Sequence, residues 1–186
     1  MPTYSTRIQP IPTSQFTDAQ AAVFGGGHGD PNNELNLVKT LVQHLDLYKR
    51  YIPFAAGLVG QSAFTPRHRE IITCRTLALV QETYEAAAHI AMSAGAGLSD
   101  AEAKAARDGG PGLPPFETAL VRGTEELVKQ QRLTDATWAT LSQQYSKEQM
   151  IELHFLVGNY VLMATISKGL GIQVEEAGSA AWKPPT

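Results

Sequence analysis

Three side chains between positions 81 and 89 have the types and the spacing needed for proton transfer. Glu82, Glu85 and His89 stand at i, i+3 and i+7, so they share one face if this segment is helical. Two carboxylates and an imidazole in a desolvated setting shift one another's pKa values, and such groups suit general acid–base catalysis near neutral pH. The three alanines at positions 86–88 leave room for a cavity or a closely packed partner helix.

Two other interpretations of this face stay open. In a purely structural one, Glu82 and Glu85 lie on a solvated rim and His89 is a hydrogen-bonded core residue. In the other, the three side chains hold a divalent metal ion, as carboxylates and histidines do in helix bundles. The spacing is Glu-x-x-x-His rather than the Glu-x-x-His of di-iron proteins, and further ligands would have to come from Glu152 and His154. On spacing alone, acid–base chemistry, a structural face and a metal site all stay open.

Four further side chains are candidates for binding a substrate: Tyr84, Arg75, His154 and Tyr160. Arg75 lies on a mainly apolar stretch, where it needs an acidic partner or holds a substrate carboxylate bidentately. Tyr160 is able to place its hydroxyl in a cavity, although aromatic core packing is the usual role of such a residue.

A charged turn and a single cysteine complete the set of reactive side chains. Arg67, His68, Arg69 and Glu70 follow one another; we expect Glu70 to pair with Arg67 or with another helix, and His68 to be solvated. Cys74 is expected to be a small core residue, because no second cysteine supports redox cycling. A disulfide within the chain and a four-cysteine zinc site are excluded.

Helices alone are expected to position these residues, because no run alternates cleanly enough to demand a strand. The apolar spacing and the capping residues predict helices over 36–60 (broken or kinked at Pro53), 66–94, 99–107, 116–131, 135–145 and 147–170. The last of these is apolar nearly all round and is expected to be buried on most sides. We therefore predict an all-α fold.

Glycine and proline set the predicted domain boundaries. Residues 1–34 form an N-terminal arm with one or two helical turns near 17–24, residues 35–175 form the helical domain, and residues 176–186 form an extended tail with Trp182, Pro184 and Pro185.

Composition narrows the possible partners. The 186 residues carry 15 basic and 18 acidic side chains, which gives a net charge of −3. A protein that binds nucleic acid would need an excess of basic side chains on one face, so nucleic acid is not expected as a partner. No signal peptide, transmembrane segment or basic amphipathic stretch is recognised, so a cytoplasmic protein without a membrane partner is expected. A charged fraction of only 18% leaves apolar surface for a homo-oligomer interface.

Several of these segments together resemble the carboxymuconolactone decarboxylase family. The resemblance is carried by Pro66–Ile72, by Tyr84-Glu85-Ala86-Ala87-Ala88-His89 and by Ala94–Ser99. The segments 36–53 and 149–160 resemble the first and last core helices of the family, so that the likeness covers roughly residues 31–175. It implies an alkylhydroperoxidase D-like helical fold and an assembly into dimers, trimers or hexamers.

The resemblance implies one of two kinds of chemistry, because the family has a peroxidase branch and a decarboxylase branch. Relatives of the peroxidase branch use a Cys-x-x-Cys pair with a glutamate and a histidine, whereas Glu82 and Glu85 stand at the two cysteine positions here. The decarboxylase branch acts on lactone acids by acid–base chemistry without a cofactor, and Glu85 and His89 match the family's Glu and His positions. Glu82 departs from the usual pattern.

The predicted function is therefore a cofactor-independent lyase, decarboxylase or isomerase acting on a small cyclic or lactone acid. His89 is expected to shuttle the proton, Glu85 to orient it or act as the base, and Glu82 to serve as a second acid–base group. The alternatives are a metal-dependent oxygenase or hydrolase that uses the same face, and an oligomer that binds a ligand without turnover.

Overall fold

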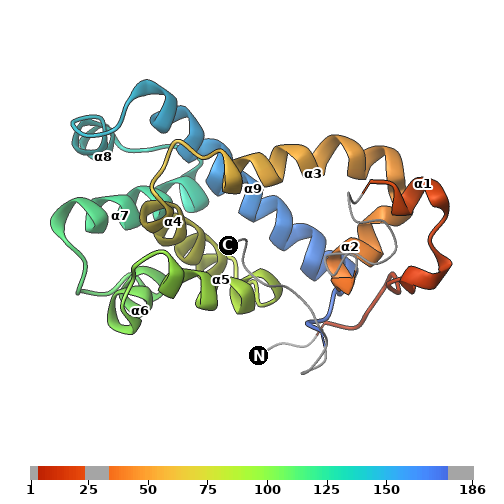
Figure 1. Ribbon diagram of the computed structural model, residues 1–186. Coiled ribbons are helices and arrows are strands. Elements are labelled where there is room, and N and C mark those ends of the chain that lie inside the picture. Colours follow the sequence, from red (N-terminus) through yellow and green to blue (C-terminus); the bar gives the residue numbers. More distant parts are fainter. Residues whose placement is uncertain (1–3, 24–33, 176–186) are drawn as a thin grey trace. The chain divides into compact units, whose positions relative to one another are not determined.

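The computed structural model describes residues 4–23 and 34–175 (Figure 1). Within these residues all the regular secondary structure is helical and no strand is present, as predicted. The chain divides into two compact units. The larger unit holds residues 56–165, and the terminal unit holds the described residues up to 55 together with 166–175. The predicted division into arm, domain and tail stays a prediction. Phe24, the glycine-rich stretch that follows it, and Trp182, Pro184 and Pro185 of the predicted tail lie outside the described residues.

The terminal unit consists of short helices around a small core of its own. It contains η1 (Thr13–Gln15), α1 (Asp18–Ala21), α2 (Asn36–Leu41), η4 (Val42–His44), the first part of α3 (Leu45–Gly60) and the end of α9. Its core side chains are Phe16, Ala21, Val38, Val42 and Tyr48.

The predicted break at Pro53 is wrong, because α3 runs through the proline. The interruption falls earlier, at η4 (Val42–His44), which separates α2 from α3. A proline inside a helix removes one backbone hydrogen bond. Here buried side chains lie on both sides of it, Tyr48 before and Leu58 after, and we attribute the continuity of the helix to their packing.

The larger unit is built around α4 (Pro66–Leu79), which contacts α5 (Tyr84–Gly95), α6 (Asp100–Asp108) and α7 (Pro115–Gln130) (Figure 1). It also contains α8 (Asp135–Leu141) and most of α9 (Lys147–Leu170). The largest fully buried apolar side chains of its core are Ile71, Ile72, Leu77, Leu120, Leu141, Leu153 and Leu156.

Capping residues begin these helices where the sequence predicts. The hydroxyl of Thr65 accepts a hydrogen bond from the His68 amide, and Ser99 and Glu102 form a reciprocal capping box at the start of α6. Thr134 caps α8 in the same way. These caps set the first residue of each helix. They therefore also set the helix face on which each following side chain lies.

The expectation that α9 is buried on most sides is wrong for one of its faces. Leu153, Leu156 and Tyr160 pack in the core, whereas Ile151 and Leu162 are 60% and 45% exposed. By length and composition α9 is apolar enough to cross a membrane, but the core helix of a soluble protein meets the same test, and half of its most apolar stretch is buried.

Candidate active site

The helix predicted over 66–94 is two helices, and this changes the setting of the acidic face. α4 ends at Leu79, Gln81 adopts a left-handed conformation with φ of 53°, and α5 begins at Tyr84. Acidic and hydroxyl side chains compete with helical hydrogen bonding when they bond to nearby backbone amides. Glu82 does so here, and the chain turns at this point.

Glu82 closes the start of α5. One carboxylate oxygen accepts a hydrogen bond from the Tyr84 amide at 2.9 Å, and the other accepts from Glu85 and Ala86 at 2.8 and 3.3 Å. The side chain is buried, with 4% exposure. The prediction that Glu82 lies mid-helix beside Glu85 and His89 is therefore wrong. Its carboxylate satisfies the unpaired amides of a helix start.

His89 is held between two side chains from other helices. Its Nδ1 lies 2.6 Å from Oε2 of Glu70 on α4, and its Nε2 lies 3.0 Å from the hydroxyl of Tyr160 on α9. The rings of His89 and Tyr160 meet edge to face, with 5.2 Å between their centroids. All three residues are buried, so the imidazole has a fixed orientation in a desolvated site.

Arg69 supplies positive charge next to this group. Its Nε lies 3.4 Å from Oε1 of Glu70, the carboxylate oxygen that does not face His89, and its Nη1 donates to the Val59 carbonyl. A buried carboxylate needs such partners to stay ionised. Glu70 is therefore placed to accept the Nδ1–H of His89 while Arg69 engages its other oxygen.

Tyr160 keeps its phenol proton in this environment. Burial raises the pKa of its hydroxyl well above the usual value, and the negative charges of Glu85 and Glu70 raise it further. Glu85 lies in the first turn of α5 and is half-buried. The structure thus gathers Glu70, His89 and Tyr160 into one buried hydrogen-bonded chain, with Glu85 close enough to act on Tyr160 electrostatically.

The other predicted binding residues lie in different surroundings. Arg75 bonds Glu125 at 2.5 Å and the Arg107 carbonyl at 2.6 Å, which satisfies the acidic-partner alternative. Tyr84 is buried at the start of α5. His154 is exposed on α9, where its Nδ1 bonds the Met150 carbonyl at 2.7 Å.

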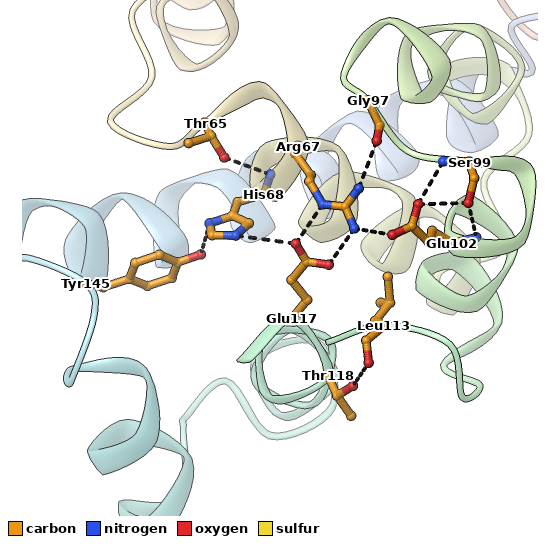
Figure 2. A network of polar contacts seen from close by, with 10 residues as sticks. All are labelled: Thr65, Arg67, His68, Gly97, Ser99, Glu102, Leu113, Glu117, Thr118 and Tyr145. Atoms are coloured by element: carbon orange, nitrogen blue, oxygen red, sulfur yellow. Dashed lines mark hydrogen bonds and ion pairs between the residues drawn. The ribbon is translucent and has the colours of Figure 1, made fainter. Parts of the chain in front are cut away.

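A second polar network joins the starts of α4, α6 and α7 (Figure 2). Arg67 donates to both carboxylate oxygens of Glu117 at 2.7 and 2.8 Å, to Glu102 at 2.5 Å and to the Gly97 carbonyl at 2.8 Å. This engagement raises the pKa of Arg67, and the hydrogen bond from Arg67 lowers the pKa of Glu102 to about 2. The network satisfies the guanidinium within the protein itself.

His68 belongs to the same network, and the expectation of a solvated His68 is wrong. Its Nδ1 lies 2.9 Å from the Tyr145 hydroxyl and its Nε2 lies 3.7 Å from Glu117 (Figure 2). Burial lowers the pKa of His68. Burial likewise raises the pKa of Tyr145.

Cys74 is buried, as predicted, and its Sγ lies 3.4 Å from the Ser93 hydroxyl. Burial raises the pKa of its thiol to about 11, so very little reactive thiolate is present at neutral pH.

The metal interpretation gains no support from the side-chain positions. In residues 4–23 and 34–175, no three His, Cys, Asp or Glu side chains are grouped so that they could hold a metal ion. Glu152, named as a further ligand, instead bonds the Ser62 hydroxyl and the Ala63 amide.

Sequence reasoning left the partner of Glu70 undecided and did not connect it with His89. One signal was available: Glu70, Thr73 and Leu77 are spaced as one helical face, and all three are buried. A carboxylate on a core-facing stripe demands a buried partner. Naming that partner required the break between α4 and α5.

Part of the chain matches a known protein family. Residues 46–110, which include Glu70, Glu82 and His89, match the model of the Carboxymuconolactone decarboxylase family. No curated protein matches the chain significantly.

Two solved structures share the fold. A protein of unknown function from Agrobacterium tumefaciens, named as a candidate antioxidant defence protein AhpD, gives a TM-score of 0.64 at 17% identity, over 72% of this chain and 94% of its own. An uncharacterised peroxidase-related protein from Ralstonia eutropha JMP134, described as an alkylhydroperoxidase AhpD core, gives 0.72 at 15% identity, over 92% and 95%. At these identities the likeness shows the fold alone. The chain therefore has the all-α, alkylhydroperoxidase D-like fold, and its residues 46–110 match the carboxymuconolactone decarboxylase family, as the sequence predicted.

Proposed function

We propose that this protein is a cofactor-independent acid–base enzyme, a lyase, decarboxylase or isomerase acting on a small cyclic or lactone acid. The observation that carries the proposal is the 2.6 Å contact between Glu70 Oε2 and His89 Nδ1 in a fully desolvated setting. A carboxylate that holds an imidazole in one orientation and stabilises its protonated form is the arrangement that general acid–base catalysis requires.

The proposal changes the roles that the sequence suggested for Glu85 and Glu82. Glu70 replaces Glu85 as the group that orients His89. Glu82 caps α5 and takes no proton in the proposed chemistry, while Glu85 tunes the electrostatic environment of Tyr160. General acid–base catalysis by a positioned side chain contributes roughly 10²- to 10⁴-fold to a rate.

A thiol peroxidase is the activity suggested by the names of the structural neighbours, and the cysteine content opposes it. The chain has one cysteine, and burial raises the pKa of that thiol to about 11. A peroxidase that relies on a thiolate needs the opposite shift. Cys74→Ser is therefore expected to retain the proposed activity in full.

The test is turnover of a panel of lactone acids and β-keto acids by the full chain, followed by NMR and repeated with a chelator present. We expect His89→Gln and Glu70→Gln to lower kcat/KM at least about 100-fold on any compound that the wild type converts. His44→Gln and Glu148→Gln, which alter exposed residues of the same types, are the matched controls and should keep the wild-type rate.

Two results would contradict this assignment. Wild-type rates in both His89→Gln and Glu70→Gln would remove the acid–base pair from the reaction. Ligand-induced stabilisation without chemical change, across the whole panel, would instead indicate a binding protein. A small-molecule substrate, a homo-oligomeric state and a cytoplasmic location are part of the same proposal.

A further inference from the structure

Both ring nitrogens of His89 are already engaged within the protein. Glu70 takes Nδ1 and Tyr160 takes Nε2, at 2.6 and 3.0 Å. A substrate therefore cannot reach either nitrogen while these hydrogen bonds persist. Any proton that enters or leaves the imidazole at Nε2 has to pass through the hydroxyl of Tyr160.

The chemistry of the three groups fixes the direction of these hydrogen bonds. The Glu70 carboxylate, with Arg69 beside its other oxygen, only accepts, so Nδ1 of neutral His89 carries the proton. Nε2 is then a bare acceptor, and the Tyr160 O–H donates to it. The phenol oxygen then keeps its lone pairs, and one of them is within hydrogen-bonding reach of the Thr73 hydroxyl, which leaves one acceptor position for a partner outside the chain.

Glu70, His89 and Tyr160 are all buried, so exposure does not distinguish the two ends of this chain of side chains. Their hydrogen-bonding capacity does. Both carboxylate oxygens of Glu70 are occupied, one by His89 and the other by Arg69, whereas the phenol oxygen keeps an acceptor position. The phenol is therefore the end of the chain that a small molecule would engage.

We propose that the Tyr160 hydroxyl is the catalytic group that exchanges a proton with the substrate, and that Glu70 and His89 act through it as positioning and proton-storing residues. This inference rests on the proposed acid–base function and deepens it. It also narrows the substrate class to a carbon acid, a molecule with a C–H bond next to a carbonyl group.

The step balances within the protein and the substrate. The phenol oxygen takes the proton from the substrate carbon while the phenol O–H proton moves to Nε2 of His89. The electron pair of the broken C–H bond moves into the carbonyl as an enolate, and His89 becomes an imidazolium next to the Glu70 carboxylate. Return of both protons, with delivery to a different carbon, completes an isomerisation without an oxidant, a reductant or a metal.

The charged groups around the relay come from each of its helices. Arg69 and Glu70 lie on α4, Glu85 and His89 on α5, and Tyr160 on α9. The reactive form needs an intact phenol O–H, because that proton is the one passed to His89. The relay in this form therefore operates only while Tyr160 is protonated.

The first measurement needs no substrate. Nitrogen-15 NMR of the full chain labelled in histidine, with His89 assigned by His89→Gln, reports which ring nitrogen carries the proton. We expect the Nδ1–H tautomer for neutral His89, and a change in the Nε2 signal in Tyr160→Phe. A neutral His89 in the Nε2–H tautomer would overturn the relay whatever the activity is.

The second measurement separates a catalytic phenol from one that merely holds the ring. On a compound that the wild type converts, Tyr160→Phe should lower kcat at least about 100-fold. Replacement of Tyr160 by 3,5-difluorotyrosine, a more acidic phenol, should keep turnover at neutral pH and give the pH profile an alkaline limb at lower pH than any limb of the wild type. Tyr145→Phe removes the same hydroxyl from the His68 pair and should leave both kcat and the profile unchanged.

The outcomes distinguish this inference from the proposed function. Loss of activity in His89→Gln with a wild-type rate in Tyr160→Phe and an unmoved profile in the fluorinated protein would overturn the relay and keep the acid–base enzyme. Absence of turnover by the wild type on every compound would overturn both.

Discussion

His89 owes its orientation to a carboxylate on another helix, 19 positions earlier in the chain. Glu70 has no exposed surface, so removal of its side chain leaves an imidazole and Arg69 without their acceptor in the core. Breaking a buried pair of this kind from one side costs about 3 kcal/mol or more. We expect Glu70→Ala to lower the free energy of unfolding by about 3 kcal/mol in urea titrations.

Asp108→Ala is the matched control for that measurement. It also removes a carboxylate with two basic partners, Lys104 and Arg107, but in an exposed setting. A surface ion pair contributes at most about 1 kcal/mol, so equal losses in the two variants would contradict the assignment of Glu70 to the buried core.

Cys74 gives a second prediction at the scale of a single residue. Its thiol pKa of about 11 leaves little thiolate at pH 8. Compared with an unfolded cysteine, this alone slows alkylation by roughly 200-fold. We expect iodoacetamide to label the native protein at least that much more slowly than the protein in urea, with mass spectrometry as the readout. Comparable rates in the two states would show an accessible, activated thiol.

The sequence singled out individual residues of the buried hydrogen-bonded chain but did not predict their partners. His89 and Tyr160 were both candidates, because each type of side chain is unusual on an apolar helix. The structure places the two in hydrogen-bonding contact. Glu82 was assigned to the chemistry, since a continuous helix would have placed it on the same face. Its real role depends on three backbone amides that become available only where the helix breaks.

The turn between α4 and α5 carries the first prediction at the scale of elements. Gln81 has φ of 53°, a conformation that costs free energy for any residue with a Cβ. Gln81→Gly should raise the free energy of unfolding by about 0.5 kcal/mol, and Gln81→Val should lower it by at least about 1 kcal/mol.

The same substitution inside a helix provides the contrast. Lys104→Gly changes an exposed position of α6 and should lower stability by about 1 kcal/mol. Thermal unfolding followed by circular dichroism separates the two signs. A loss of stability in Gln81→Gly as large as that in Lys104→Gly would mean that α4 and α5 are continuous in solution.

The Arg67 network links three helix starts and makes stability depend on pH (Figure 2). The folded protein holds the pKa of Glu102 at about 2, below the value of about 4.3 for an unfolded chain. This contribution is fully present above about pH 5 and is lost as the pH falls toward 2. We expect Arg67→Met to flatten the decline in melting temperature between pH 5 and pH 3.

Arg67→Met should also cost stability at neutral pH. Glu117, with a side chain only 9% exposed, loses both of its guanidinium hydrogen bonds, and we expect a loss of about 2 kcal/mol at pH 7. Arg107→Met, which affects the exposed Asp108, is the control and should retain the acid sensitivity that comes from Glu102. An unchanged pH dependence in Arg67→Met would show that the contact between Arg67 and Glu102 is not the cause of the acid sensitivity.

Helix starts were predictable because a cap acts within four residues of chain. Thr65, Ser99 and Thr134 all begin helices as expected. Helix continuity was less predictable, because it depends on packing and on side chains that compete for backbone amides. For that reason α3 passes through Pro53, whereas α4 ends before Glu82 although the sequence there contains neither glycine nor proline.

At the scale of the whole molecule, the sequence predicts a homo-oligomer from its low charge content. The exposed apolar side chains of α9 in the larger unit, Ile151 and Leu162, are compatible with such an assembly. Light scattering after gel filtration should therefore give a mass of at least twice the 20.1 kDa of one chain. Ile151→Glu should shift that mass downward, and a mass of 20.1 kDa for the wild type would contradict the prediction.

The cap formed by Glu82 has an electrostatic consequence for the ligands that this protein can accept. The amino end of a helix carries a partial positive charge and exposed amides, which make it a natural receptor for anions. In α5 that receptor is filled by the protein's own carboxylate, bonded to three amides. An acidic substrate therefore gains no helix-dipole attraction there, and its negative charge has to be neutralised elsewhere.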